Sequence, residues 1–290
     1  MKGFSIRKIG NVAATEYVKW ICNPRISIFL CMFVFVYDYV IKELAKASVD
    51  VGSKCGITET FLAVSNSPLL VLVMPAVFIA LIGDFPKTDG NTMFYIQRTG
   101  KQNWLFGQLV FIIYAAFTFM AAVFAGSVLF SLPFSEVNQK WSDVVTKYVY
   151  LFPDRIQSLA ANLITGRMYN NVTPSEALFL TFTLVFLYLV LLGMILMTGF
   201  AIGKRVVGIG INCTIMCIGS GMMGMGLLAQ WLFPSANAIS WTHFDPIMKQ
   251  QIFEIKYSYL YFIGLIVVLF IFDLIAIGRY DFAKITDMED

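Results

Sequence analysis

Long apolar runs separated by short polar segments dominate the hydropathy pattern of the chain. A helix that crosses a bilayer needs about 20 consecutive, mostly apolar residues. Six runs approach or exceed this length, and they cover residues 26–42, 66–83, 104–130, 175–201, 207–231 and 257–278. The first two runs are short, and they contain Asp38 and Pro75, respectively. The last four are long and have clear apolar patterns. The pattern predicts an all-α integral membrane protein with six transmembrane helices.

Composition supports this class and excludes others. The 290 residues are 58% hydrophobic and only 13% charged, whereas soluble globular proteins carry about 25% charged residues. The net charge of +3 gives no clustered basic footprint for nucleic acid. The five cysteines form no C-x-x-C pair and His243 is the only histidine, so no metal site is expected.

The basic residues between the runs predict an orientation, because cytoplasmic loops are enriched in Lys and Arg. If both termini are cytoplasmic, the inside segments hold 12 of the 21 basic residues. Residues 26–278 then form the six-span domain, with a cytoplasmic loop at about 84–103 and a tail at 279–290. No small-residue cleavage site follows the first apolar run, so that span is expected to stay in the mature protein.

Residues 1–25 precede the first span and have helical periodicity. Apolar and aromatic side chains recur at three- and four-residue steps, at Ile6, Ile9, Ala13, Tyr17 and Trp20. The basic residues fall on other faces. This pattern is typical of an amphipathic helix that lies in the membrane interface. The alternative is a disordered basic tail.

The two longer segments outside the runs are predicted to lie on the extracytoplasmic side. Residues 131–174 are too rich in aromatic side chains for a mobile loop, and we expect short helices against the outer leaflet or the bundle. Residues 233–256 have a similar but shorter pattern, which places His243 outside.

Catalytic and nucleotide-binding motifs are not found. One histidine cannot supply a triad or a metal cluster. Residues 199–205, GFAIGKR, approach the phosphate-binding loop G-x-x-x-x-G-K-[ST]. The spacing between the glycines is one residue short, and Arg205 stands where Ser or Thr is required. The sequence therefore predicts no enzyme activity, cofactor or metal in this chain.

Asp273 is the one acidic residue well inside a late apolar run, in VLFIFDLIAIG. A carboxylate at that depth is costly and marks a candidate functional site. The alternative is an interfacial residue that reaches cytoplasmic water, because Arg279 and Asp281 follow within two turns.

A short basic segment, FYIQRTGKQNWLFGQ at 94–108, interrupts two of the most apolar stretches. Thr88, Asp89 and Asn91 can each cap a helix start, and Gly100 can end one. The segment is compatible with a short helix that is apolar on one side. An ordinary positively charged cytoplasmic loop is the alternative.

The run GDFP, then YIQRTGK, then WLFGQ leading into a span resembles membrane subunits of bacterial ABC transporters of the type-2 exporter class. The likeness extends to the amphipathic lead, six spans and long outer segment. It implies a coupling helix between the second and third spans that docks on a separate ATPase subunit. The residues expected at that interface are Asn91, Thr92, Phe94, Tyr95, Gln97, Arg98 and Lys101.

The resemblance also implies a function: the permease half of an ATP-driven exporter in the bacterial cytoplasmic membrane. Its expected partners are ATP-binding cassette subunits, a second permease chain and the lipid bilayer, with ATP and Mg²⁺ on the ATPase. The alternative is a non-transporting membrane scaffold or sensor partner of a cytoplasmic protein. A membrane enzyme comes third, because no catalytic constellation is visible.

Overall fold

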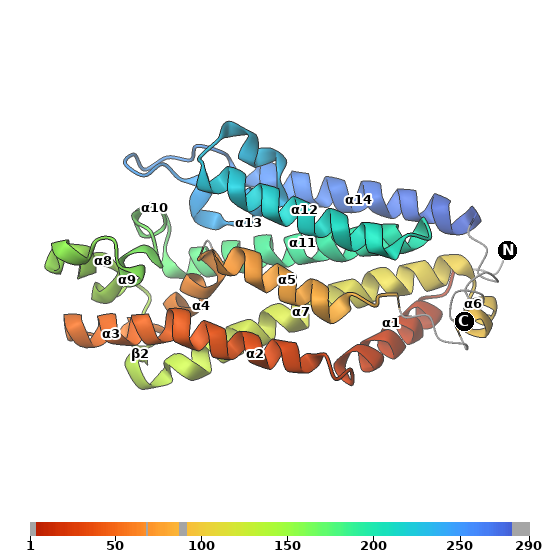
Figure 1. The fold of residues 1–290 in the computed structure, drawn as a ribbon, viewed down its shortest axis with the longest axis horizontal. Helices are drawn as coiled ribbons and strands as arrows, with labels where there is room; N and C mark the ends of the chain where they lie inside the picture. Colours follow the sequence, from red (N-terminus) through yellow and green to blue (C-terminus); the bar gives the residue numbers. More distant parts are fainter. Residues whose placement is uncertain (1–3, 68, 87–91, 280–290) are drawn as a thin grey trace.

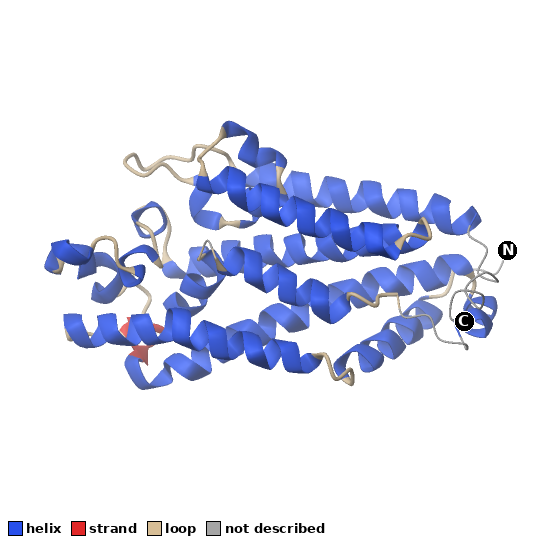
Figure 2. Cartoon of the chain, viewed as in Figure 1, coloured by secondary structure: helices blue, strands red, loops and turns tan. Residues whose placement is uncertain are grey.

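The computed structural model describes residues 4–67, 69–86 and 92–279, which form an elongated bundle of helices (Figure 1). Figure 2 shows that most of this part of the chain is helical. Two short strands, β1 (Cys55–Gly56) and β2 (Ser135–Glu136), pair in parallel with Cys55 opposite Ser135. The predicted all-α class is confirmed.

Four helices in the described ranges are long and apolar enough to cross a membrane. They are α7 (Lys101–Ser131), α11 (Pro174–Ala201), α12 (Arg205–Gly224) and α14 (Ile255–Arg279). Three of them match the predicted runs within three residues at each end. The run predicted to continue to residue 231 stops at Gly224, because Gly226 takes a left-handed φ of 64° and a 3₁₀ turn, η4 (Leu228–Leu232), follows.

The first predicted span is part of a longer helical segment. It begins with α2 (Ile26–Val36), passes through the π-helical turn η1 (Tyr37–Ile41), and continues as α3 (Lys42–Val51). The sequence prediction ended at residue 42 because α3 is amphipathic rather than apolar throughout. Its buried face, with Leu44 and Ala47, packs on other helices, and Gly52 ends it with φ 72°.

The second predicted span is bent. α4 (Ile57–Asn66) and α5 (Leu70–Ile82) meet at an angle of 80°, and counting the pair as one span gives five candidates. The prediction of one span over 66–83 therefore describes only α5, which tolerates Pro75 within its helix. The whole of α4 is almost completely enclosed by the rest of the bundle.

Residues 131–174 form a set of short helices at one end of the bundle (Figure 1). These are η2 (Leu132–Phe134), α8 (Asp143–Leu151), η3 (Pro153–Arg155), α9 (Leu159–Asn162) and α10 (Gly166–Tyr169). Ser142 and Ser158 cap α8 and α9, as serine side chains commonly do. The carboxylate of the buried Glu59 on α4 accepts hydrogen bonds from both the amide and the hydroxyl of Ser142, each at 2.6 Å. This links the α8–α10 group to α4.

The centre of the bundle is α11, which packs against α4, α7, α12 and α14. Glycines permit the closest approaches. A Cβ on Gly193 would lie 2.6 Å from Ile112 of α7, and one on Gly199 would lie 2.8 Å from the Cα of Gly208 on α12. The short helix α13 (Pro234–Ala238), followed by η5 (Ser240–His243), is buried beside α11 and α12.

Candidate functional site

The connection between α5 and α7 contains α6 (Thr92–Thr99), a short helix at the end of the bundle opposite the α8–α10 group (Figure 1). The Thr99 hydroxyl donates to the Tyr95 carbonyl at 2.8 Å. Gly100 then turns the chain into α7 with a φ of 90°, a value that favours glycine. The short helix expected before Gly100 is present.

One face of α6 packs on the protein and the other is accessible. Ile96 and Thr99 are buried, and Tyr95 is half-buried against the hydrophobic core. Gln97 and Arg98 are exposed. Among the predicted interface residues, these two present the clearest surface to another protein.

The remaining predicted interface residues lie elsewhere. Asn91 and the side chain of Phe94 fall outside the described part of the structure. Thr92 is buried at the start of α6. Lys101 is the first residue of α7, and its ammonium group contacts the Gly278 carbonyl of α14 at 3.4 Å. The α6–α7 corner therefore touches the last turn of α14.

Two arginines contact the connection as it leaves α5. The Arg25 guanidinium, directly before α2, lies 2.9 Å from the Asp84 carboxylate. The Arg205 guanidinium, at the start of α12, donates to the Pro86 carbonyl at 2.6 Å and lies over the ring of Phe200. The residues that follow α5 are thus bound to the residue before α2 and to the start of α12.

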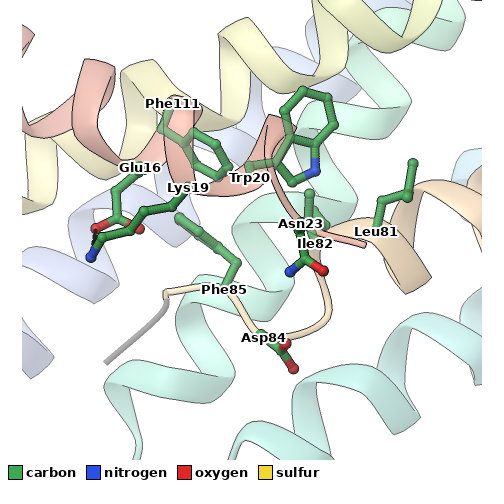
Figure 3. A pocket seen from close by; sticks show the side chains of 9 residues that line it. All are labelled: Glu16, Lys19, Trp20, Asn23, Leu81, Ile82, Asp84, Phe85 and Phe111. Atoms are coloured by element: carbon green, nitrogen blue, oxygen red, sulfur yellow. Dashed lines mark ion pairs between the residues drawn. The ribbon is translucent and has the colours of Figure 1, made fainter. Parts of the chain in front are cut away.

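Between these contacts, Phe85 is buried where α1 (Ile6–Ile21), α5 and α7 meet. Its ring stacks on Phe111 with centroids 5.0 Å apart. Figure 3 shows both rings beside a small pocket of about 30 Å³, lined also by Trp20 and Asn23. The Trp20 indole N–H is buried without a hydrogen-bond partner in the described chain. The pocket is large enough for one water molecule that could accept this bond.

The same corner anchors the amino-terminal helix. The Ser5 amide donates to the Asn103 side-chain oxygen at 3.0 Å, and the Asn103 amide group donates to the Thr99 carbonyl at 2.9 Å. One asparagine therefore connects the start of α1, the end of α6 and the first turn of α7.

The periodic face of the lead packs largely on α7. Ile9 and Trp20 are buried, and the Tyr17 hydroxyl shares a 2.9 Å hydrogen bond with Thr118. Ile6, in contrast, is 79% exposed. The helix has one side against the bundle and leaves its other side free, at the end where α6 lies.

Asp273 is fully buried on α14, and neither carboxylate oxygen has a hydrogen-bond partner within the described residues. Thr198 on α11 is a polar side chain beside this carboxyl group, and its hydroxyl donates to the Met194 carbonyl. The alternative prediction, that this carboxylate reaches water at the helix end, does not agree with the complete burial of the side chain. A buried carboxylate without a partner is costly, so a role outside simple packing is favoured.

Sequence reasoning did not single out Asp84 or predict the contacts of Arg25 and Arg205. Each flanks an apolar run, where charged residues are ordinary interface anchors. Arg25 and Asp84 are far apart along the chain, and no periodicity joins them. The only signal was that each residue flanks an apolar run, which does not reveal a partner.

Comparison of the chain with protein-family models, curated proteins and solved structures found no match. Within the described ranges, no three His, Cys, Asp or Glu side chains gather as ligands for a metal ion.

Proposed function

We propose that the chain is the permease subunit of an ATP-driven exporter of the ABC class. The carrying observation is α6, a short helix at one end of the bundle whose flanking segment is bound by Arg25 and Arg205. A separate ATPase would bind α6 and supply the ATP and Mg²⁺. A second permease chain, identical or homologous, would complete the assembly.

The contacts around α6 provide a route for force. Because α6 continues through Gly100 into α7, a displacement of α6 acts directly on α7. The Arg25–Asp84 pair is partly exposed and contributes only about 0–1 kcal/mol. The Phe85–Phe111 stack adds about 0.5–1.5 kcal/mol. Because these contacts are individually weak, the α6–α7 corner would carry most of the load.

The proposed arrangement has six crossings in the bacterial cytoplasmic membrane. They are the α2–α3 segment, the bent α4–α5 pair, α7, α11, α12 and α14. Ser5, near the start of the chain, and Gly278, near the end of the last helix, both lie beside the α6–α7 corner. Both ends of the bundle's path therefore lie on the same side, which agrees with an even number of crossings. With the basic residues counted as inside, that end faces the cytoplasm, and alternating access would expose a path between paired permeases to either side.

A scaffold or sensor that binds a cytoplasmic protein through α6 is the competing function. It would use the same exposed Gln97 and Arg98 and would need no ATPase. The two functions differ in the identity of the partner.

Site-specific photocrosslinking in the native host tests the proposal. A photoreactive amino acid at position 98 should form an adduct with a protein that contains G-x-x-x-x-G-K-[ST]. The same group at position 7, exposed on α1, is the matched control and should not. Adducts at position 98 only with proteins that lack this motif would contradict the permease function and favour a scaffold.

A further inference from the structure

A groove of about 370 Å³ lies between α11, α12 and α14. Its walls are mainly aliphatic, with Ile195 from α11, Ile211 and Ile215 from α12, and Leu265 and Leu269 from α14. The segment 232–234, which leads into α13, lines it as well. The groove is therefore bounded by three of the membrane-length helices.

Only three lining residues carry a polar side-chain group. The Thr198 hydroxyl donates to the Met194 carbonyl at 3.0 Å, and the Tyr261 hydroxyl donates to the Leu232 carbonyl at 2.8 Å. The third is Lys204, which is exposed and whose ammonium group has no ion pair or hydrogen bond within the part of the chain described. An apolar groove with one unpaired cation is the complement of an amphiphile with a negative head.

The size of the groove fits one leaflet. Its lining extends from Leu191 on α11 to Ile202, the residue directly after that helix, which at about 1.5 Å per residue is roughly 16 Å. Half of a typical hydrocarbon core is about 15 Å. Lys204 lies in the turn between α11 and α12, at the α6 end of the bundle (Figure 1). A lipid with its head at Lys204 would belong to the leaflet at that end.

We propose that this groove binds one acyl chain of an anionic membrane phospholipid, with the phosphate paired to Lys204. The neighbouring Arg205 is engaged with the Pro86 carbonyl and the Phe200 ring, so Lys204 supplies the charge. The bound chain would fill the space beside the close α11–α12 contact at Gly199 and Gly208. This site is separate from α6 and does not depend on an ATPase partner.

Native mass spectrometry of the full chain released from detergent tests the site. The probes are phosphatidylglycerol and phosphatidylcholine with identical acyl chains. Phosphatidylglycerol should bind more tightly, and Lys204→Ala should weaken it about fivefold, the effect of one basic residue near an anionic headgroup. Lys204→Arg should retain it. Equal binding of the two lipids, or no effect of Lys204→Ala, would overturn the assignment of the headgroup.

A second pair of variants tests the acyl-chain groove. Ile215→Trp adds a large ring inside the groove and should reduce binding of both lipids. Ile263→Trp, on α14 but outside the groove lining and 51% exposed, is the matched control. Equal lipid binding by both variants and the wild type would show that lipid does not occupy the groove. A stable second copy in place of bound lipid would also contradict the proposal.

Discussion

At the scale of single residues, the buried polar side chains define the most specific expectations. Asp273 has no partner for its carboxylate, whereas Glu59 accepts four contacts from Cys55, Gly56 and Ser142. A buried polar group that is fully hydrogen-bonded serves the fold, and one that is not needs another explanation. The two carboxylates should therefore respond differently to substitution.

Asp273→Asn keeps the shape of the side chain and removes the charge. Relief of an unpaired buried carboxylate should leave thermal stability unchanged or raise the free energy of unfolding by up to about 1–3 kcal/mol, while transport falls. Asp38→Asn, an exposed carboxylate paired with Lys42, is the control and should change neither property. Thermal unfolding in detergent and transport in vesicles provide the measurements. Normal transport by Asp273→Asn would assign this residue to packing alone.

His243, the last residue of η5, gives a pH-dependent expectation. Its ring nitrogens lie 3.0 Å from the Ile239 carbonyl and 2.8 Å from the Ser258 hydroxyl. Burial lowers the pKa of His243 from 6.5 to about 4, although hydrogen bonds with the backbone at Ile239 and Ser240 oppose this shift. The folded state therefore favours neutral imidazole.

Stability should consequently fall in acid. Between about pH 6.5 and 4 the unfolded chain binds a proton at His243 that the folded chain does not, so the contribution is complete above pH 6.5 and is lost as the pH falls toward 4. The full difference corresponds to roughly 3 kcal/mol. Thermal unfolding at pH 7 and pH 5 should show a smaller loss for His243→Gln than for the wild type. Equal losses would contradict the assignment.

At the scale of elements, α6 and its flanking segment make the main functional expectation. Arg98 is exposed, so Arg98→Glu should not disturb folding, but it reverses a charge at the proposed ATPase contact. If Arg98 is an anchor, ATPase affinity should fall by about 2 kcal/mol, or roughly thirtyfold. Co-purification and ATP-dependent transport provide the readouts, with Arg7→Glu on α1 as control. Unchanged ATPase content in the Arg98 variant would count against the anchor.

Tyr95 needs a different variant, because its side chain is half-buried against the protein's own core and its hydroxyl has no hydrogen-bond partner within the described residues. Tyr95→Ala should loosen α6 itself, and loss of the ATPase would not distinguish docking from folding. Tyr95→Phe removes only the unsatisfied hydroxyl and should keep both the helix and the partner, as measured by co-purification. A loss of partner in Tyr95→Phe would assign the hydroxyl to the interface.

The Arg25–Asp84 contact can be tested by charge exchange. Arg25→Asp and Asp84→Arg should each uncouple ATP hydrolysis from transport, and the double variant should restore part of the coupling, since the pair is re-formed with the charges reversed. The effect on stability should stay within about 1 kcal/mol because the pair is partly exposed. If the effects of the two single variants on coupling simply add in the double variant, the contact is not part of the force route.

The sequence predicted some of these elements well because a single physical signal determines them. α11 and α14 follow long apolar runs, and their ends are marked by Thr173-Pro174 and by the polar segment before residue 255. α3 and α4 were not predicted, because polar residues such as Lys46 and Glu59 interrupt their apolar positions, and packing partners support their helical structure. The Arg25–Asp84 contact could not be predicted for a different reason. An ion pair between residues far apart in the sequence leaves no local pattern.

At the scale of the whole molecule, both ends of the bundle carry basic residues. The end with α6 holds Arg25, Arg98 and Arg205, and the α8–α10 end holds Lys147 and Arg155 in ion pairs beside exposed apolar side chains such as Val137 and Tyr150. The proposed orientation in the membrane therefore needs a direct test.

Cysteine labelling in intact cells tests that orientation. In a background without the native cysteines, single cysteines at Val137 and Ile247, which are 85% and 90% exposed, should react with a membrane-impermeant maleimide added outside. Cysteines at Phe4, 66% exposed, and at Lys204 should react only after the cells are opened. Outside labelling at residue 204 would invert the proposed topology.

The π-helical turn η1 joins α2 and α3. A π turn holds one more residue than an α turn, so it acts as an inserted residue within an otherwise regular helix. Deleting one residue from 37–41 should convert the turn to α-helix and leave the orientation of α3 nearly unchanged, because one turn with the extra residue is replaced by one turn without it. Asp50 should then keep its ion pair with Arg155 of η3, and a cysteine pair at positions 50 and 155 that forms a disulfide in the full-length chain should still form one after the deletion. The turn thus accommodates one extra residue without changing the face that α3 presents to η3.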